Sequence, residues 1–420
     1  MTKKSDTRWF AAIGPGLLVA ATGVGAGDLA TASFTGVQLG VAVLWVVVLG
    51  AAIKFVLNEG LARYQLATGD TILEGCSERL GRPFHFCFLL YLLPWSVFVG
   101  AALMGACGVT AHAILPVMDE PARAKIVFGI AHSMLGVALV RIGGYGLFER
   151  VMRLCIGVMF VTVVVTAVLV RPEWPQVFRG LLVPTIPQFH GAGLGWTVAL
   201  MGGVGGTLTV LCYGYWIREE GRENESDLRV CRIDLGVGYG MTALFGMAMV
   251  IIGSQVEVEG KGAGLIVALA DRLEGSVGVV GRWAFLLGAW GAVFSSLLGV
   301  WQAVPYIFAD FVSLALREPK DARSRRVSTR SPTYRWFLYA LAVVPIIGLR
   351  YGFRDIQKYY AVIGAAFMPF LAAVLLYLNG HASFVGHRMK NRPATTVVLA
   401  IVLTLFCVAG WFSIRATFPG

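Results

Sequence analysis

Charged residues are scarce in this chain. Of its 420 residues, 14% are Asp, Glu, Lys or Arg and 57% are apolar, whereas a soluble domain has about 25% charged and about 45–50% apolar residues. The composition therefore excludes an ordinary water-soluble domain and indicates a chain that is mostly surrounded by lipid.

Motifs of enzymes and of metal-thiolate sites are also missing. The seven cysteines form no C-x-x-C pair, and six of them lie in or beside apolar runs, so we interpret them as small core residues. The sequence contains no G-x-x-x-x-G-K-[ST] phosphate loop, no H-E-x-x-H and no nucleophile elbow. We therefore expect neither an enzyme nor an ATP-driven pump and no bound cofactor, and solute gradients are the expected energy source.

Long apolar runs are what the chain has instead. Crossing the hydrocarbon core takes about 20 residues per helix. Eleven runs qualify, at approximately 9–32, 41–64, 84–115, 124–142, 146–170, 192–217, 230–254, 277–315, 334–350, 356–379 and 394–414. The sequence therefore predicts an all-α, polytopic membrane protein that forms a single membrane domain over residues 1–420.

The net charge of +11 follows the membrane topology. If the N-terminus is cytoplasmic, 23 of the 35 Lys and Arg residues lie on the cytoplasmic side and 11 on the opposite side, which leaves Lys54 within a span. By the positive-inside rule, we expect a cytoplasmic N-terminus and an outside C-terminus, in a bacterial inner (plasma) membrane. No nucleic-acid partner is needed to explain the charge, and the basic run from Arg317 to Arg335 is expected to be a cytoplasmic loop that could touch anionic lipid.

Glycine clusters interrupt the first and sixth runs. The clusters are Thr22–Asp28 (TGVGAGD) and Met201–Thr207 (MGGVGGT), and each interior glycine costs a helix about 1 kcal/mol relative to alanine. One such cluster is equally well explained by close helix packing. Two clusters five spans apart indicate an inverted repeat and a secondary transporter with its site at the breaks. The predicted repeats are 9–170 and 192–379, followed by an additional helix at 394–414.

Asp28 is the main candidate for chemistry. An ionisable group at mid-membrane is a functional hypothesis by default, and this one directly follows the first glycine cluster. A carboxylate beside freed backbone carbonyls can coordinate a hard cation or hold a proton. The alternative is structural, because Asp is also a favoured N-cap for the second half-helix, and the two roles can coexist.

Charges near the ends of two other spans are candidates for a gate. Glu59 lies near the end of the second run, five residues after Lys54, and Arg232 and Asp234 open the seventh. We take Glu59, Arg232 and Asp234 as gating candidates. Interfacial ion pairs and snorkelling side chains are the simpler explanation of the same charges.

Three motifs carry a family resemblance. The run Gly14–Val19 (GPGLLV), the triplet Arg232–Asp234 (RID) and the run Ser295–Gly299 (SSLLG) resemble, in order and spacing, motifs of the natural-resistance-associated macrophage protein (NRAMP) family of metal transporters. The resemblance implies a LeuT-like fold of eleven helices in a five-plus-five inverted repeat, with helices 1 and 6 broken. It also implies transport of a divalent metal cation.

The chain departs from the family pattern at the breaks. Where the family has Asp-Pro-Gly-Asn in helix 1, this chain has Gly25–Asp28 (GAGD), and where the family has Met-Pro-His in helix 6, it has Thr207–Thr209 (TLT). A second family histidine is replaced by Gly214. The third run, 84–115, contains no Asp or Glu, so coupling to protons is expected to be weak or absent.

These departures imply a substrate site made of oxygen ligands. The implied metal ligands are Asp28 and Thr207, and the implied substrate-binding residues are Asp28, Gly25, Ala26, Gly27, Val204, Thr207, Tyr213 and Ser295. Without the family's soft methionine, such a site favours Mg²⁺ or Mn²⁺ over Fe²⁺.

Two other functions are compatible with the sequence. Amides at half-helix N-termini also suit a carboxylate, so the chain could instead move a small organic solute such as an amino acid, with Tyr213 packed on a cationic or apolar group. A receptor or scaffold that moves nothing is the third hypothesis. Uptake measurements with metal ions and amino acids discriminate between them.

Overall fold

The computed structural model describes residues 14–189, 191–256, 262, 264–316 and 328–417, and every regular element in these ranges is helical. The first part of the chain contains α2 (Pro15–Gly23), η1 (Val24–Thr31), α3 (Ala32–Leu39), η2 (Gly40–Val43), α4 (Leu44–Thr68), α5 (Ile72–Ile114), α6 (Pro121–Leu169) and α7 (Trp174–Leu182). The middle contains α8 (Ala192–Gly203), η3 (Leu208–Leu211), α9 (Cys212–Glu219), η4 (Glu225–Asp227), α10 (Leu228–Gly253) and α11 (Leu265–Val277). The last part contains α12 (Val279–Ala315), α13 (Pro332–Val343), η5 (Val344–Arg350), α14 (Phe353–Ala365), α15 (Phe367–Leu378), α16 (Ala382–Met389) and α17 (Pro393–Thr417).

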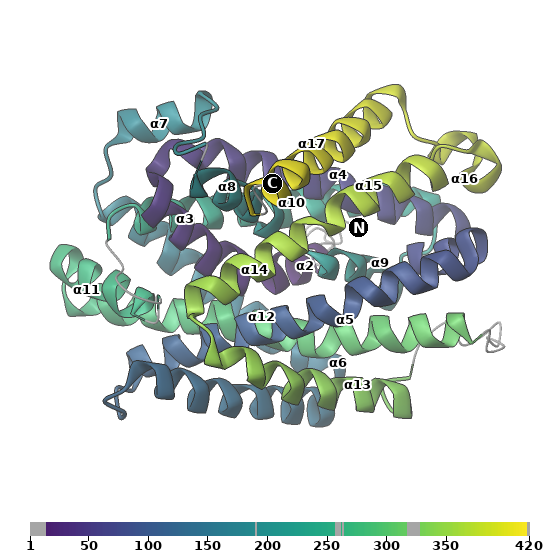
Figure 1. The fold of residues 1–420 in the computed structure, drawn as a ribbon. Helices are drawn as coiled ribbons and strands as arrows, with labels where there is room; N and C mark the ends of the chain where they lie inside the picture. Colours follow the sequence, from purple (N-terminus) through teal and green to yellow (C-terminus); the bar gives the residue numbers. More distant parts are fainter. Residues whose placement is uncertain (1–13, 190, 257–261, 263, 317–327, 418–420) are drawn as a thin grey trace, which may run out of the picture.

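The helices form the predicted polytopic bundle (Figure 1). Among the described residues, nine helices are long and apolar enough to cross a membrane, or ten if the bent pair 157–169 and 174–182 is one span. One 42-residue stretch, Gly27–Thr68, covers the end of the first predicted span and the whole of the second. This joining accounts for the difference from eleven, and the all-α membrane fold is confirmed. The repeat boundaries at 9–170 and 192–379 stay a prediction.

Short helices lie at the two ends of the bundle, where the sequence analysis expected only connecting loops. Helices α7 and α11 lie at one end and α16 at the other (Figure 1). Helix α7 follows a 117° bend after the end of α6, and it begins with a proline in its first turn. Proline is well tolerated at that position, because the first amides of a helix have no partner inside it.

The two predicted breaks lie at the centre of the fold and differ in kind. The first is a π-helix, η1, so the chain there stays helical. The second is unwound: helical geometry ends at Gly203, and Gly205 and Gly206 have φ values of 71° and 87°. These angles lie in the left-handed region that glycine adopts without a steric penalty, and the chain resumes as a 3₁₀ turn at Leu208.

Glycines in the first span allow the two interrupted helices to touch. A Cβ atom added at Gly23 would lie 2.2 Å from the Gly206 nitrogen, and one added at Gly27 would lie 2.2 Å from the Gly203 oxygen. Both approaches are too close for any side chain. Close packing, the structural explanation of a glycine cluster, therefore applies to the first span, and it brings the two interruptions into direct contact.

Candidate functional site

Asp28 lies where the two interruptions meet. It belongs to η1 and is completely buried. Its two carboxylate oxygens accept hydrogen bonds from the Gly205 amide at 3.3 and 3.2 Å. The residue before α3 is Thr31, with no side-chain cap bond, so Asp28 does not take the alternative N-cap role. Its carboxylate instead joins the first helix to the unwound loop of the sixth.

Lys54 occupies the other side of the same loop. It lies on α4 and is also completely buried. Its Nζ atom donates hydrogen bonds to the carbonyl oxygens of Gly202 at 2.9 Å and Val204 at 2.5 Å, and also to that of Gly206. The last carbonyls of a helix have no partner inside it and carry partial negative charge. The ammonium therefore neutralises the end of α8 where the helix breaks.

Lys54 neither snorkels nor pairs with Glu59, because it is buried and bonded to the loop. The ammonium and the Asp28 carboxylate attract each other across the loop. An uncompensated charge at this depth would cost several kcal/mol, so each group depends on the other and on the loop. A lysine in the middle of an apolar run was the available signal, since intramembrane charges are rarely without a role.

Thr207, a predicted metal ligand, ends the unwound loop. Its hydroxyl oxygen accepts a hydrogen bond from the Trp95 indole nitrogen at 2.8 Å, and Tyr360 also hydrogen-bonds to it. Trp95 comes from α5, the third span. That span supplies an aromatic donor to the site rather than an acid, and the sequence analysis did not single out either aromatic residue.

Ser296, and not the predicted Ser295, contacts the first interruption. The Ser295 hydroxyl donates to Ala292 within its own helix at 3.0 Å. The Ser296 hydroxyl accepts from the Gly25 amide at 2.6 Å and donates to the Ala21 carbonyl at 2.7 Å. The helix turns the second serine of the motif, and not the first, toward the π-helix. The side chain of Ala26 lies outside the described part of the structure.

Tyr213 lies away from the breaks, contrary to the prediction that it binds substrate. Its hydroxyl donates to the Cys231 carbonyl at 3.2 Å and to Asp234 Oδ2 at 3.1 Å. The same carboxylate accepts from Arg222 at 3.0 Å. Burial lowers the pKa of Arg222, but the Asp234 charge outweighs this and the pKa is raised. Tyr213 thus belongs to a polar cluster around the start of α10.

Asp234 holds the first helix at its N-terminus. It accepts hydrogen bonds from the amides of Gly14 at 3.1 Å and Gly16 at 2.9 Å. A Cβ atom at Gly16 would lie 2.4 Å from the Asp234 carbonyl oxygen. A carboxylate at a helix N-terminus is favourable, because it meets free amides and the positive end of the dipole. The GPG and RID motifs therefore bind each other.

Glu59 and Arg232, both gating candidates, are paired. Two nitrogens of Arg232 donate to Glu59 Oε1 at 3.0 and 2.6 Å, and Arg63 lies 3.3 Å from Glu59 Oε2. Arg63 also donates to the carbonyls of Met389 and Lys390. These contacts join α4, α10 and the end of α16, and whether they gate a pathway stays a prediction.

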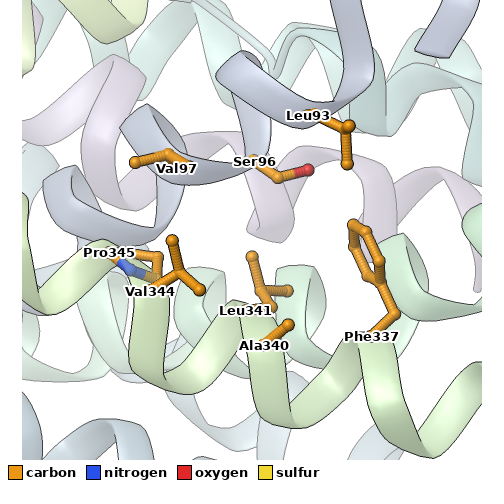
Figure 2. A pocket seen from close by; sticks show the side chains of 8 residues that line it. All are labelled: Leu93, Ser96, Val97, Phe337, Ala340, Leu341, Val344 and Pro345. Carbon is orange, nitrogen blue, oxygen red and sulfur yellow. The ribbon is translucent and has the colours of Figure 1, made fainter.

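Other sites for a ligand have little support. In the described ranges, no three His, Cys, Asp or Glu side chains come together to hold a metal ion. A cavity of about 220 Å³ lies between α5 and the α13–η5 segment (Figure 2). Its lining residues are Leu93, Ser96, Val97, Phe337, Ala340, Leu341, Val344 and Pro345. The single polar side chain, Ser96, donates to Leu92 in its own helix, so this cavity is unsuited to a cation.

Comparisons with known proteins agree with the fold and the motifs. The chain is 25% identical over 441 residues to the divalent metal cation transporter MntH of Chromohalobacter salexigens, covering 98% of this chain and 93% of that protein. It is 26% identical over 282 residues to an uncharacterized protein of Pasteurella multocida, covering 66% of this chain and 64% of that protein.

Solved structures show the same fold. A mutant of the Eremococcus coleocola manganese transporter superposes with a TM-score of 0.77 at 15% identity, over 99% of this chain and 89% of that one. The crystal structure of MhsT in complex with L-phenylalanine gives a TM-score of 0.63 at 14% identity, over 96% and 98% of the two chains. The predicted LeuT-like fold is confirmed. The model of the natural resistance-associated macrophage protein-like family (Nramp) matches residues 16–415, and the chain therefore belongs to this family of multi-pass membrane proteins.

Proposed function

We propose that this protein is a secondary transporter that moves a divalent metal cation, with the substrate bound where η1 meets the unwound loop. The proposal rests on the groups that line the unwound loop. Its carbonyls and the Asp28 carboxylate already stabilise a buried positive charge, that of Lys54. A site built in this way selects for cations, and the names of the MntH relatives support the same class of substrate.

The ligand chemistry favours Mg²⁺ or Mn²⁺ over Fe²⁺. The groups that the structure brings to the loop are a carboxylate, backbone carbonyls and the Thr207 hydroxyl. Oxygen ligands suit hard cations, whereas a soft sulfur ligand would favour later transition metals. Manganese also accepts oxygen ligands, so it is the practical test ion.

We further infer alternating access, with the N-terminus in the cytoplasm and the C-terminus outside a bacterial inner membrane. The Glu59–Arg232 pair and the bonds from Asp234 to Gly14 and Gly16 close the end of the bundle that carries the start of α2. Rocking of one helix bundle would have to break them. The absence of Asp and Glu from 84–115 argues that transport is not strongly coupled to protons.

A small organic solute is less well supported. A carboxylate substrate would need free amides at the interruptions, but the Gly205 amide is bound to Asp28 and the Gly25 amide to Ser296. Tyr213, the predicted aromatic contact, is held in the cluster around Asp234. The amides and the tyrosine that suggested an organic substrate are therefore already bonded within the protein.

Uptake into proteoliposomes tests the proposal. We expect wild-type protein to take up Mn²⁺ and Mg²⁺, and Asp28→Asn to reduce uptake by about tenfold or more, as loss of about 1.4 kcal/mol of binding would do. Glu274→Gln is the matched control, because Glu274 pairs with Arg282 and is 42% exposed. The proposal is wrong if no divalent cation enters, or if an amino acid enters and Asp28→Asn transports metal as well as the wild type.

A further inference from the structure

We propose that Lys54 is a tethered cation that occupies the carbonyl ligands of the sixth-helix break, so that a divalent cation binds there only after the ammonium has moved away. This inference rests on the proposed function and adds a regulatory element to the same site. It assigns a role to a residue that lies on neither of the two interrupted helices.

The ammonium of Lys54 has as many N–H donors as the loop offers it carbonyl acceptors. A lysine ammonium has three N–H donors and no acceptor, and three carbonyl oxygens, those of Gly202, Val204 and Gly206, accept from Lys54 Nζ. The donors and the acceptors are therefore equal in number. This complete set of hydrogen bonds offsets the cost of burying the ammonium.

These carbonyls are what the unwound loop offers to a cation. Hard divalent cations bind backbone carbonyls and carboxylates, and the loop presents its carbonyls to Lys54 while its Gly205 amide holds Asp28. A metal ion at these oxygens and an ammonium on the same oxygens would repel each other. Binding of one excludes the other.

Two side-chain oxygen atoms beside the loop are available to a further positive group. Asn58 is one turn after Lys54 on α4, and Thr242 on α10 lies 3.3 Å from the Cβ position of Gly205. Both residues are completely buried, and neither Asn58 Oδ1 nor Thr242 Oγ1 has a hydrogen-bond partner among the described residues. Buried oxygens of this kind normally have partners, and a positive group arriving at the loop would provide one.

The flexible stem of lysine makes the exchange feasible. Lysine carries its charge on four methylene groups with free rotation, whereas the planar group of arginine is fixed in geometry. The ammonium can therefore leave the three carbonyls without a change in the path of α4. The proposal predicts a site that is electrically balanced when it is empty and that binds metal more weakly than its oxygen ligands alone would allow.

Metal binding to Lys54 variants tests the inference. Full-length protein is purified in detergent, and Mn²⁺ affinity is measured by titration calorimetry and from the free Mn²⁺ signal in paramagnetic resonance. Lys54→Met, which keeps the length of the side chain and removes the charge, is expected to bind Mn²⁺ about tenfold or more tightly than the wild type. Lys358→Met is the control, because Lys358 lies on α14 against Trp196, and it should bind like the wild type.

A second variant covers the case in which Lys54→Met does not fold. Lys54→Gln retains N–H donors for the loop carbonyls but has no charge, and it should also bind Mn²⁺ more tightly. Adding Asp28→Asn to either variant should remove the gain. Unchanged or weaker Mn²⁺ binding in a folded Lys54 variant would overturn the inference. If neither variant folds, reductive methylation of wild-type protein decides: Mn²⁺ should speed the labelling of Lys54, and an unchanged rate would contradict the exchange.

The two proposals fail in different ways. If wild-type protein neither binds nor moves a divalent cation but a Lys54 variant binds Mn²⁺, the proposed function is wrong and the role of Lys54 stands. If wild-type protein transports Mn²⁺ and the Lys54 variants bind it with the same affinity, the role of Lys54 is wrong and the proposed function stands.

Discussion

Asp28 and Lys54 bind the two ends of one peptide group, the one that joins Val204 to Gly205. Asp28 accepts from the Gly205 amide, and Lys54 donates to the carbonyls of the residues on either side, Val204 and Gly206. Both side chains are completely buried. The loop therefore lies between a negative and a positive group, and each charge compensates the other.

This arrangement predicts strong coupling between the two residues in stability. Asp28→Asn or Lys54→Met alone should each destabilise the protein by about 3–5 kcal/mol, because removal of one partner leaves a buried charge uncompensated. The double variant should lose clearly less than the sum of the two. Thermal unfolding in detergent, read by tryptophan fluorescence, measures all three. Additive losses would show that the two charges do not compensate each other.

Ser296 should matter more than Ser295. Ser296→Ala leaves the Gly25 amide without its partner beside η1, and a buried unsatisfied group costs about 1–3 kcal/mol. We expect lower thermal stability and lower Mn²⁺ uptake. Ser295→Ala removes only a bond within α12 and serves as the comparison. Equal effects of the two substitutions would contradict the position assigned to Ser296.

Gly205 should tolerate no side chain. Its φ of 71° is unfavourable for other residues, at about 1–2 kcal/mol, and a Cβ atom there would lie 2.8 Å from the Tyr239 ring. Gly205→Ala should therefore destabilise the protein and reduce Mn²⁺ uptake. Gly240→Ala, in α10 with open space around the Cβ position, should be neutral or slightly stabilising. Wild-type uptake by Gly205→Ala would show that the loop does not need its present shape.

The Glu59–Arg232 pair should affect access more than stability. Because the Arg232 side chain is 44% exposed, the pair should contribute no more than about 1 kcal/mol to folding. Arg232→Gln is expected to raise the reactivity of a cysteine introduced at Gly14, where a Cβ atom would have space, toward a water-soluble maleimide. The exchange Glu59→Arg with Arg232→Glu should partly restore protection. If the introduced cysteine reacts equally in all of these proteins, Glu59 and Arg232 do not form a gate.

The sequence predicted the fold because its main signals are local. Apolar runs, the basic bias and the GPG, RID and SSLLG motifs are each contained in a few neighbouring residues, and they placed Asp28 and Thr207 at the meeting of two helices. The role of Lys54 was missed because it depends on contacts with residues about 150 positions away. Ser295 was chosen over Ser296 because helix rotation, set by packing, decides which of two adjacent side chains faces the site.

The sequence also did not predict the form of the first interruption. A glycine cluster is compatible with an unwound segment and with tight packing, and only the approach of Gly23 and Gly27 to the sixth helix separates the two. Tyr213 was placed at the site because it follows the second break closely in sequence, but the 3₁₀ turn and α9 carry it to the cluster around Asp234.

Localising a bound ion tests the central claim most directly. Crystals of the wild type and of Lys54→Met, grown with Mn²⁺, can be measured at the manganese absorption edge. We predict an anomalous peak in Lys54→Met within bonding distance of Asp28 and of the loop carbonyls that Lys54 now occupies, and a weaker peak at the same place in the wild type. A peak elsewhere in the bundle, or none in either protein, would contradict the account.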